Sequence, residues 1–454
     1  MRKWLKRLAW TAMALFIILG SLWAISRWRG PTDAQAAALA VIREPIPPLQ
    51  GSNAFPPLWQ LPYAIPEAER EAVFAEDVRR MRSGSRADAA TAVVAMLGTS
   101  VAEGRYPAST PTEVLGRFCN LGEDCLKKVS ADRAGYAELV ARYAALLDRA
   151  DALRSHAGVR QSFGYHYGAP MPAFQYARLP LTRQALLFLS GERDAAMDAA
   201  CRSVSTWRRL GSDSDSLISR LIGVAAVDAH GRLFAQMLAE TPRDAALPAS
   251  CVAAFAPPSG LELSICRAVR GEFALTDTVI AAVPDDPALL DAWWSRRMPS
   301  LFFDPTMSAA DIAEPYAYHC RSDAARAMAE DARVDAPEKE RGLLRLECVS
   351  NLQGCILGDI ATPDFDDYAA RVQDSNAQLR LVGLLLKLRG EAGDARPFEA
   401  RLRDEAAAIG ASARAPTLTA DGTAVRIRNS STSRGEFREL PLPAYFRVGD
   451  GASR

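Results

Sequence analysis

Residues 179–210 read LPLTRQALLFLSGERDAAMDAACRSVSTWRRL, and this stretch decides the fold class. Apolar side chains recur at helical spacing in both halves of it. They are Ala185, Leu186 and Leu189, then Ala196, Ala200, Val204 and Trp207. Ser190-Gly191 between the halves is a turn signal. The stretch therefore predicts two antiparallel helices joined by a short turn.

Helical periodicity extends on both sides of this hairpin. Ser130 is a candidate cap for a helix that continues to Ala150, and Pro66-Glu67 opens another. No period of about 34 residues repeats, so a regular solenoid is not predicted. We expect a mainly α-helical body over residues 67–410, built as an irregular array of helical hairpins. Further helices are expected near residues 287–298, 308–330, 338–351, 363–389 and 397–409.

The character of the chain changes in residues 411–454. Leu418 precedes Asp421-Gly422, after which Val425 and Ile427 alternate with polar residues. Alternation around an Asp-Gly pair predicts a β-hairpin with a type I′ turn. We expect a small β-hairpin there, joined by residues 437–442, and then a C-terminal tail.

The N-terminal residues 1–29 form a predicted membrane anchor. An uncharged stretch covers residues 8–26, and at about 1.5 Å per residue it crosses most of a hydrocarbon layer of roughly 30 Å. More basic residues precede the stretch than follow it, so its start is expected in the cytoplasm and the body in the periplasm. We expect a single-pass protein of the bacterial inner membrane that contacts the lipid bilayer through residues 8–26.

Cleavage of this segment is the alternative to anchoring. Ala24 and Ser26 fit the small-residue positions of a signal-peptidase site. The apolar region is longer than a signal peptide needs, which favours an uncleaved signal-anchor. Residues 30–66 contain many prolines, which exclude regular helix and favour an extended strap. Large apolar residues such as Phe55 and Trp59 predict that this strap is docked on the body.

Eight cysteines favour an oxidising compartment independently of the anchor. Short spacing predicts structural disulfides between Cys119 and Cys125, between Cys251 and Cys266, and between Cys348 and Cys355. Cys201 and Cys320 are paired by elimination. No spacing is CxxC, so neither a redox pair nor a zinc knuckle is indicated.

No motif points to a cofactor, a metal or a catalytic residue. The chain has no HExxH, GxSxG, Walker A or GxGxxG sequence. Its 54 basic and 54 acidic residues balance, which argues against nucleic acid as a partner. The four histidines, His156, His166, His230 and His319, do not stand at metal-ligand spacing on one helix. Each is expected to be a surface histidine or a satisfied core histidine rather than a catalytic or metal-binding residue.

Acidic residues occur in short groups beside predicted helix starts. Asp364, Asp366 and Asp367 follow Thr362-Pro363, and we interpret them as helix capping. The same interpretation applies to Asp213 and Asp215, ahead of a helix that opens near Leu217.

Two aromatic segments are candidate partner surfaces. Tyr165, His166 and Tyr167 lie in a glycine-flanked loop that either lines a pocket or packs on the core. Tryptophan and arginine dominate binding hot spots, and they concentrate in a second group. That group consists of Trp293, Trp294, Arg296 and Arg297.

The chain resembles a group of membrane-anchored periplasmic helical proteins of Gram-negative bacteria. The resemblance rests on the anchor, on the cysteine-containing segments, and on residues 207–218, which read WRRLGSDSDSLI. It covers most of the chain. The resemblance implies the same compartment, and it implies no activity or catalytic residue.

Three functions remain open on the sequence alone. The first is a membrane-anchored periplasmic interaction protein that binds a protein or peptide of the cell envelope, as helical arrays do through their surfaces. The second is an inhibitor or immunity protein against an exported toxin. The third is a periplasmic hydrolase, which would require titratable groups converging in a cleft.

Overall fold

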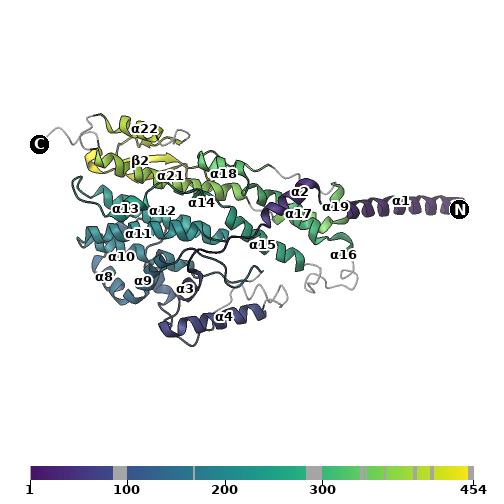
Figure 1. The fold of residues 1–454 in the computed structure, drawn as a ribbon, viewed down its shortest axis with the longest axis horizontal. Helices are drawn as coiled ribbons and strands as arrows, with labels where there is room; N and C mark the ends of the chain where they lie inside the picture. The colour runs from purple at the N-terminus through teal and green to yellow at the C-terminus, as the bar shows by residue number, and fades with distance from the viewer. Residues whose placement is uncertain are drawn as a thin grey trace.

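The computed structural model describes residues 2–84, 100–166, 169–282, 299–337, 342, 345–361, 364–391, 396–408 and 414–447. These parts form an elongated, mainly helical body (Figure 1). The N-terminal helix projects from one end of the body, and the C-terminal sheet lies toward the other end. The fold is mainly α-helical with a small C-terminal sheet, as the sequence predicts.

The N-terminal helix α1 covers Arg2–Arg29 and is long and apolar enough to cross a membrane. Most of its large apolar side chains are exposed, including Phe16 and Ile17. Contact with the body begins near its C-terminal end, where the Ser26 hydroxyl lies 2.7 Å from the hydroxyl of Ser350. Most of α1 therefore extends away from the body without packing on it.

Residues 30–66 are docked on the body but are not extended throughout. The prediction that proline excludes regular helix here is wrong for α2 (Asp33–Ile42) and α3 (Phe55–Gln60). Thr32 forms a capping box with Gln35 at the start of α2, in the interval between prolines. In α3 the prolines occupy the first turn, where a missing N–H costs nothing.

The predicted hairpin over residues 179–210 is confirmed as α10 (Leu179–Leu189) and α11 (Arg193–Ser212). Helix α12 (Leu217–Ala239) packs antiparallel against α11. A Cβ atom on Gly223 would lie 2.6 Å from the Cα atom of Gly211, so glycine at both positions permits this close crossing. These three helices form the centre of the body.

The predicted single helix from Ser130 to Ala150 is divided in two. The chain forms α8 and α9 with a break at Tyr143, and Asp132 rather than Ser130 caps α8. Short helices around this region complete one side of the body. They are η1 (Glu67–Glu69), α4 (Arg70–Gly84), α6 (Thr112–Leu115), α7 (Cys125–Ser130), α8 (Arg133–Arg142), α9 (Ala144–Asp151), η2 (Ala152–Ser155) and η3 (Phe174–Arg178).

The remaining helices lie between α12 and the sheet in sequence. The helix expected near 308–330 is two helices, and that expected near 287–298 lies outside the described residues. The long helix α21 packs beside α12. The helices are α13 (Ala249–Ala254), α14 (Gly260–Leu263), α15 (Cys266–Ala282), α16 (Pro299–Phe302), α17 (Pro305–Tyr318), α18 (Ser322–Ala329), α19 (Leu346–Ser350), α20 (Leu352–Ala361), α21 (Phe365–Gly390) and α22 (Phe398–Ala408).

The C-terminal sheet has three antiparallel strands in the order β1 (Thr417–Leu418), β2 (Ala424–Arg428) and β3 (Phe437–Pro441). A short 3-10 turn, η7 (Ala444–Phe446), follows. The predicted type I′ turn is wrong. Gly422 has a positive φ of 66° but Asp421 does not, and a type I′ turn requires both. The loop is instead closed by Thr419, whose N–H donates to the Ala424 carbonyl at 2.9 Å.

Four disulfides are present, and two of the predicted pairings are wrong. Cys119–Cys125 and Cys348–Cys355 form as expected. The other four cysteines pair as Cys201–Cys251 and Cys266–Cys320. The reason is helix packing, because α13, which carries Cys251, packs on α11, whereas α15, which begins at Cys266, packs on α17.

The described apolar side chains form two main cores. The distal core, far from α1, is the larger and includes Leu58, Leu147 and Leu210. The proximal core, near the base of α1, includes Phe273 and Tyr316. Both α12 and α21 contribute residues to both cores. The two ends of the body are therefore joined by continuous helices.

Candidate functional site

The aromatic loop proposed as a partner surface is largely tied to the body. The Tyr165 hydroxyl donates to the Asp215 carboxylate at 2.6 Å. Burial, followed by the Asp215 charge, raises the pKa of that hydroxyl. His166 is half-buried beside it, and Tyr167 lies outside the described residues. The Tyr165 ring is thus held at the core edge, and a partner role for this loop stays a prediction.

The second proposed surface, Trp293, Trp294, Arg296 and Arg297, lies outside the described residues. Its role as a hot spot also stays a prediction.

The acidic groups interpreted as helix caps have mainly tertiary partners. Asp213 pairs with Arg160 and Arg267, which lie on other segments. The backbone N–H of Leu217, at the start of α12, donates instead to Glu272. The capping interpretation is therefore wrong for Asp213 and also for Asp215, which accepts from Gln161 and Tyr165.

The cluster after residue 363 combines both roles. Asp364 does cap α21, since it accepts from the Asp367 backbone N–H. Asp367 itself accepts from the hydroxyls of Ser431 and Ser433 at 2.7 and 2.8 Å. Asp366 accepts from the Ala336 backbone N–H. These carboxylates hold the C-terminal segment and the segment before α19 against α21.

The histidines do not converge on a common site. His230 is fully buried, its Nδ1 lies 2.8 Å from Gln184, and burial lowers its pKa to about 3. His319 lies beside Asp366, and burial lowers the pKa of His156. Within the part of the chain that the structure describes, no group of three His, Cys, Asp or Glu side chains is placed to hold a metal ion.

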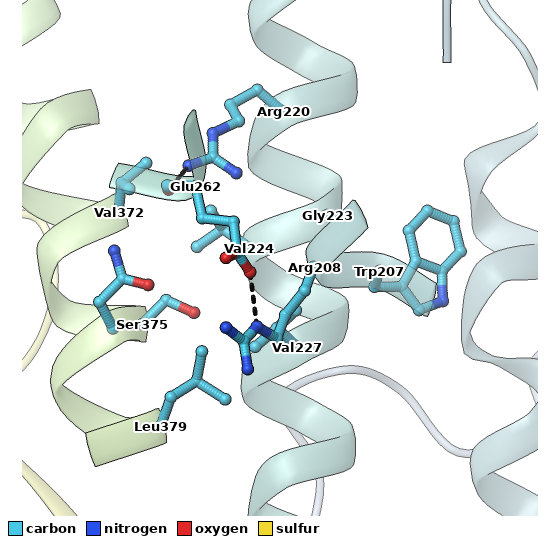
Figure 2. A pocket seen from close by; sticks show the side chains of 11 residues that line it. Trp207, Arg208, Arg220, Gly223, Val224, Val227, Glu262, Val372, Ser375 and Leu379 are labelled. Atoms are coloured by element: carbon cyan, nitrogen blue, oxygen red, sulfur yellow. Dashed lines mark hydrogen bonds and ion pairs between the residues drawn. The ribbon is translucent and has the colours of Figure 1, made fainter. Parts of the chain in front are cut away.

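A small polar pocket lies between α11, α12, α14 and α21 (Figure 2). The Arg208 Nε donates to the Glu262 carboxylate at 2.6 Å, and Arg220 donates to the Glu262 backbone carbonyl. Burial lowers the pKa of Arg220 to about 10. The volume of about 20 Å³ holds a single water molecule.

Arg208 is committed to the fold. Besides Glu262, its guanidinium donates to the Ala254 carbonyl at 2.6 Å and to the Ala256 carbonyl at 3.0 Å. These contacts bind the end of α13 to α11. We therefore interpret the pocket in Figure 2 as a structural feature of the fold, because the Arg208 guanidinium already donates its hydrogen bonds to protein groups.

A larger cleft, of about 400 Å³, lies between α12 and β3. Guanidinium groups from both elements line it. Loop residues Leu121 and Gly122 form another wall. The charged and polar lining residues are Asp228, Arg232, Asn429, Arg434, Arg438 and Glu439.

Asp228 is the buried anion at the floor of this cleft. Its two carboxylate oxygens lie 2.6 Å from Arg434 and 2.7 Å from Arg438. Burial alone would raise the pKa of Asp228, but attraction to Arg438 and Arg434 brings it below the ordinary value. Asp228 is therefore ionised and paired, and it joins α12 to the C-terminal segment.

Arg232 stands one helical turn after Asp228 and has no equivalent pairing. Among the described residues it forms no hydrogen bond or ion pair. Burial lowers its pKa, attraction to Asp228 opposes that change, and repulsion from Arg438 and Arg434 adds to it. The Nε of Arg438 is likewise buried without a partner. Among the described residues, the cleft thus holds one buried donor without a protein partner, the Arg438 Nε, and one half-buried guanidinium without a protein partner, that of Arg232.

This arrangement suits the binding of a carboxylate or similar anion. Guanidinium groups recognise planar anions through paired hydrogen bonds, and three of them meet here. The lining residues include no histidine, cysteine, serine or lysine, and the pairing of Asp228 leaves it a poor base. The cleft is therefore a candidate site for anion recognition.

Comparisons with known proteins bring no further evidence, because no family model, curated protein or solved structure matches this chain.

Sequence reasoning missed the cleft entirely. Asp228 and Arg232 lie in the middle of a mostly apolar helix, and Arg434 and Arg438 lie more than 200 positions away. The available signal was a carboxylate and a guanidinium on one face of α12, four positions apart. It predicts a local ion pair as readily as a site.

Proposed function

We propose that the chain is a membrane-anchored periplasmic interaction protein that binds a protein or peptide partner through a carboxylate seated between Arg232, Arg434 and Arg438. The supporting observation is Arg232, a half-buried guanidinium that has no protein partner among the described residues. It faces a cleft large enough for a side chain or a chain terminus. A group held in this way costs stability, so its presence favours a role in binding.

The position of the cleft supports contact with a partner away from the membrane. It is lined by the sheet side of α12, and the sheet lies toward the end of the body opposite α1 (Figure 1). A partner docked there does not compete with the bilayer for space. The exposed Phe437 beside the arginines adds an apolar contact of the kind that hot spots contain.

The compartment rests on two observations. One helix is long and apolar enough to cross a membrane, and all eight cysteines are paired in disulfides. Disulfides persist in an oxidising compartment, and the basic residues before the span favour a cytoplasmic start. We infer insertion in the bacterial inner membrane with the body in the periplasm.

Reporter fusions after Arg454 test this topology. A reporter active only in the periplasm should be active there, and a reporter active only in the cytoplasm should be silent. The opposite pattern would contradict the compartment and would remove the envelope partner with it.

Affinity capture from cross-linked envelopes tests the binding role. The variant Arg232→Ala should recover at least about tenfold less partner than the wild-type chain, since a hydrogen bond to a charged group contributes about 1.5–3 kcal/mol. Arg428→Ala is the matched control, because it removes the same charge from an exposed position on the same sheet. Equal loss in both variants, or no loss in either, would contradict the cleft as the binding site.

A further inference from the structure

Helix α20 has its faces reversed relative to an ordinary surface helix. Its largest apolar side chains point away from the body, and its smallest residues point inward. Ile360 is 78% exposed, whereas the outer face of a surface helix ordinarily carries polar or charged side chains. The exposed residues are Leu352, Ile356, Leu357 and Ile360, and the buried ones are Gly354, Cys355 and Gly358.

The orientation of α20 is fixed by its inner face. A Cβ atom on Gly354 would lie 2.0 Å from the Ser308 Oγ, so only glycine permits the approach to α17. Cys355 is buried and bonded to Cys348 of α19. The helix therefore has no alternative rotation that would turn its large apolar side chains inward.

The exposed apolar face adjoins the base of α1. Helix α20 packs on α16 and α19, and α19 in turn packs on α1. The Trp23 indole N–H donates to the Leu301 carbonyl of α16 at 2.6 Å. Figure 1 shows α16 and α19 at the end of the body from which α1 projects. Outside α1, five of the nine large apolar side chains that are exposed in the described residues lie on α16 and α20.

The charges near this face are compatible with a membrane surface. Asp359, the acidic residue of α20, accepts from the Gly342 backbone N–H and lies 3.7 Å from Arg345. Trp28, near the C-terminal end of α1, is 88% exposed. Arg27 pairs with Asp304, just before α17. Asp359 and Asp304 are thus each paired with an arginine.

We propose that α20, with Leu301 of α16, lies in the interfacial layer of the same bilayer that α1 crosses. The occupant of the apolar face is lipid, because a helix that spans the membrane leaves the body beside it and fixes its distance from the bilayer. Contacts of Trp23 and Ser26 with the body place the end of the bilayer-spanning section before Trp23. The body is then held at the membrane by two elements, which restrict its tilt. This inference rests on the proposed insertion of α1.

Photo-cross-linking in the full-length chain tests the proposal. A benzophenone amino acid replaces Ile360, and the protein is reconstituted in nanodiscs of phosphatidylethanolamine and phosphatidylglycerol. Two matched probes are placed at Phe16 in α1 and at Val252 of α13, which is 74% exposed. Because all three positions are exposed, the probe should not disturb folding. Intact mass measurement then reports lipid adducts.

We expect lipid adducts at positions 16 and 360, and at least about tenfold less adduct at position 252. One result would overturn the proposal while leaving the anchor intact. It is lipid adduct at position 16 combined with no more adduct at position 360 than at position 252. Adducts between two copies at position 360 would also overturn it, in favour of a dimer. Absence of adduct at position 16 would instead remove the membrane anchor on which both proposals rest.

Discussion

The two ends of the body expose opposite kinds of side chain. At the proximal end, α20 turns Ile356 and Ile360 outward and packs glycine inward. At the distal end, Val425 and Ile427 of β2 and Leu440 of β3 are buried, and guanidinium groups open onto a cleft. Both ends are built on α12 and α21, so the difference does not come from separate domains.

Each end departs in its own way from an ordinary protein surface, on which large apolar groups are mostly buried and charged groups are solvated or paired. Isolated exposed apolar residues are normal, but a helix with its large side chains outside indicates another nonaqueous contact. A half-buried arginine without a partner indicates a missing anion. The proximal end is therefore suited to lipid, and the distal end to a carboxylate.

The largest effects should come from the long disulfide in each core. Removing Cys201–Cys251 from the distal core, or Cys266–Cys320 from the proximal core, should lower the free energy of unfolding by about 4 kcal/mol each in the chain-entropy model. Paired cysteine-to-alanine variants in mild detergent, unfolded with urea, measure this loss.

The short Cys119–Cys125 bond is the control for loop length. Its removal should cost only about 2 kcal/mol, because the closed loop is much shorter. If a long bond contributed less than this short one, the entropic account of the two cores would be wrong.

Substitutions of two arginines of the distal cleft should differ in their effect on the free energy of unfolding, by less than the loss of a long disulfide. Arg438→Met leaves Asp228 with one partner fewer and should cost about 3 kcal/mol of unfolding free energy. Arg232→Met should not lower it and should raise it slightly, since no pairing is lost and a half-buried charge is removed. Urea unfolding of both variants makes the comparison. An equal cost for the two would mean that Arg232 is structural and not kept for a partner.

Acid should loosen the distal end. Burial alone would raise the pKa of Asp367, but hydrogen bonds from Ser431 and Ser433 bring it to about 2. A carboxylate with a lowered pKa stabilises the fold above about pH 4, and that contribution disappears as the pH falls toward 2. The loss is about 1 kcal/mol, because solvent screens part of the interaction at this partly exposed site. Hydrogen exchange of β2 and β3 at pH 5 and pH 2.5 measures it.

The control for the acid effect is Asp367→Asn. This variant should be less stable at pH 5, and its stability should fall less between pH 5 and pH 2.5 than that of the wild-type chain. The same decrease in both proteins would show that Asp367 does not supply the acid sensitivity.

The smallest effect is expected on the proximal face. Ile360→Ser should change the free energy of unfolding by less than about 0.5 kcal/mol, because the side chain is exposed. Ile312→Ala, in the proximal core, should cost about 2–5 kcal/mol. A large loss for Ile360→Ser would mean that this side chain supports the fold and that its exposure needs no lipid.

The sequence predicts the parts of this fold that depend on local pattern. The N-terminal apolar helix, the 179–210 hairpin and the strands near Asp421 all follow from the spacing of residues within one element. The disulfide pairing failed where it depended on distance along the chain. Cys251 and Cys266 are neighbours in sequence, but they lie on helices with different packing partners.

The candidate site could not be predicted from the sequence, because it also depends on contacts between segments far apart in the chain. Arg434 and Arg438 meet Asp228 only after the sheet docks on α12 and α21. That docking depends on Asp374, which is fully buried and accepts from the backbone N–H groups of Ser430 and Ser431. An aspartate within a long helix gives no indication that it binds a loop more than fifty residues away.

One measurement tests the contrast between the two ends most directly. A photoreactive amino acid is placed in living cells either at Phe437, beside the arginine cleft, or at Ile360 on α20. We predict a protein adduct at position 437 that disappears with Arg232→Ala, and a lipid adduct at position 360 that the same variant leaves unchanged. Lipid at position 437, a protein adduct there that survives Arg232→Ala, or no lipid at position 360 would contradict the account.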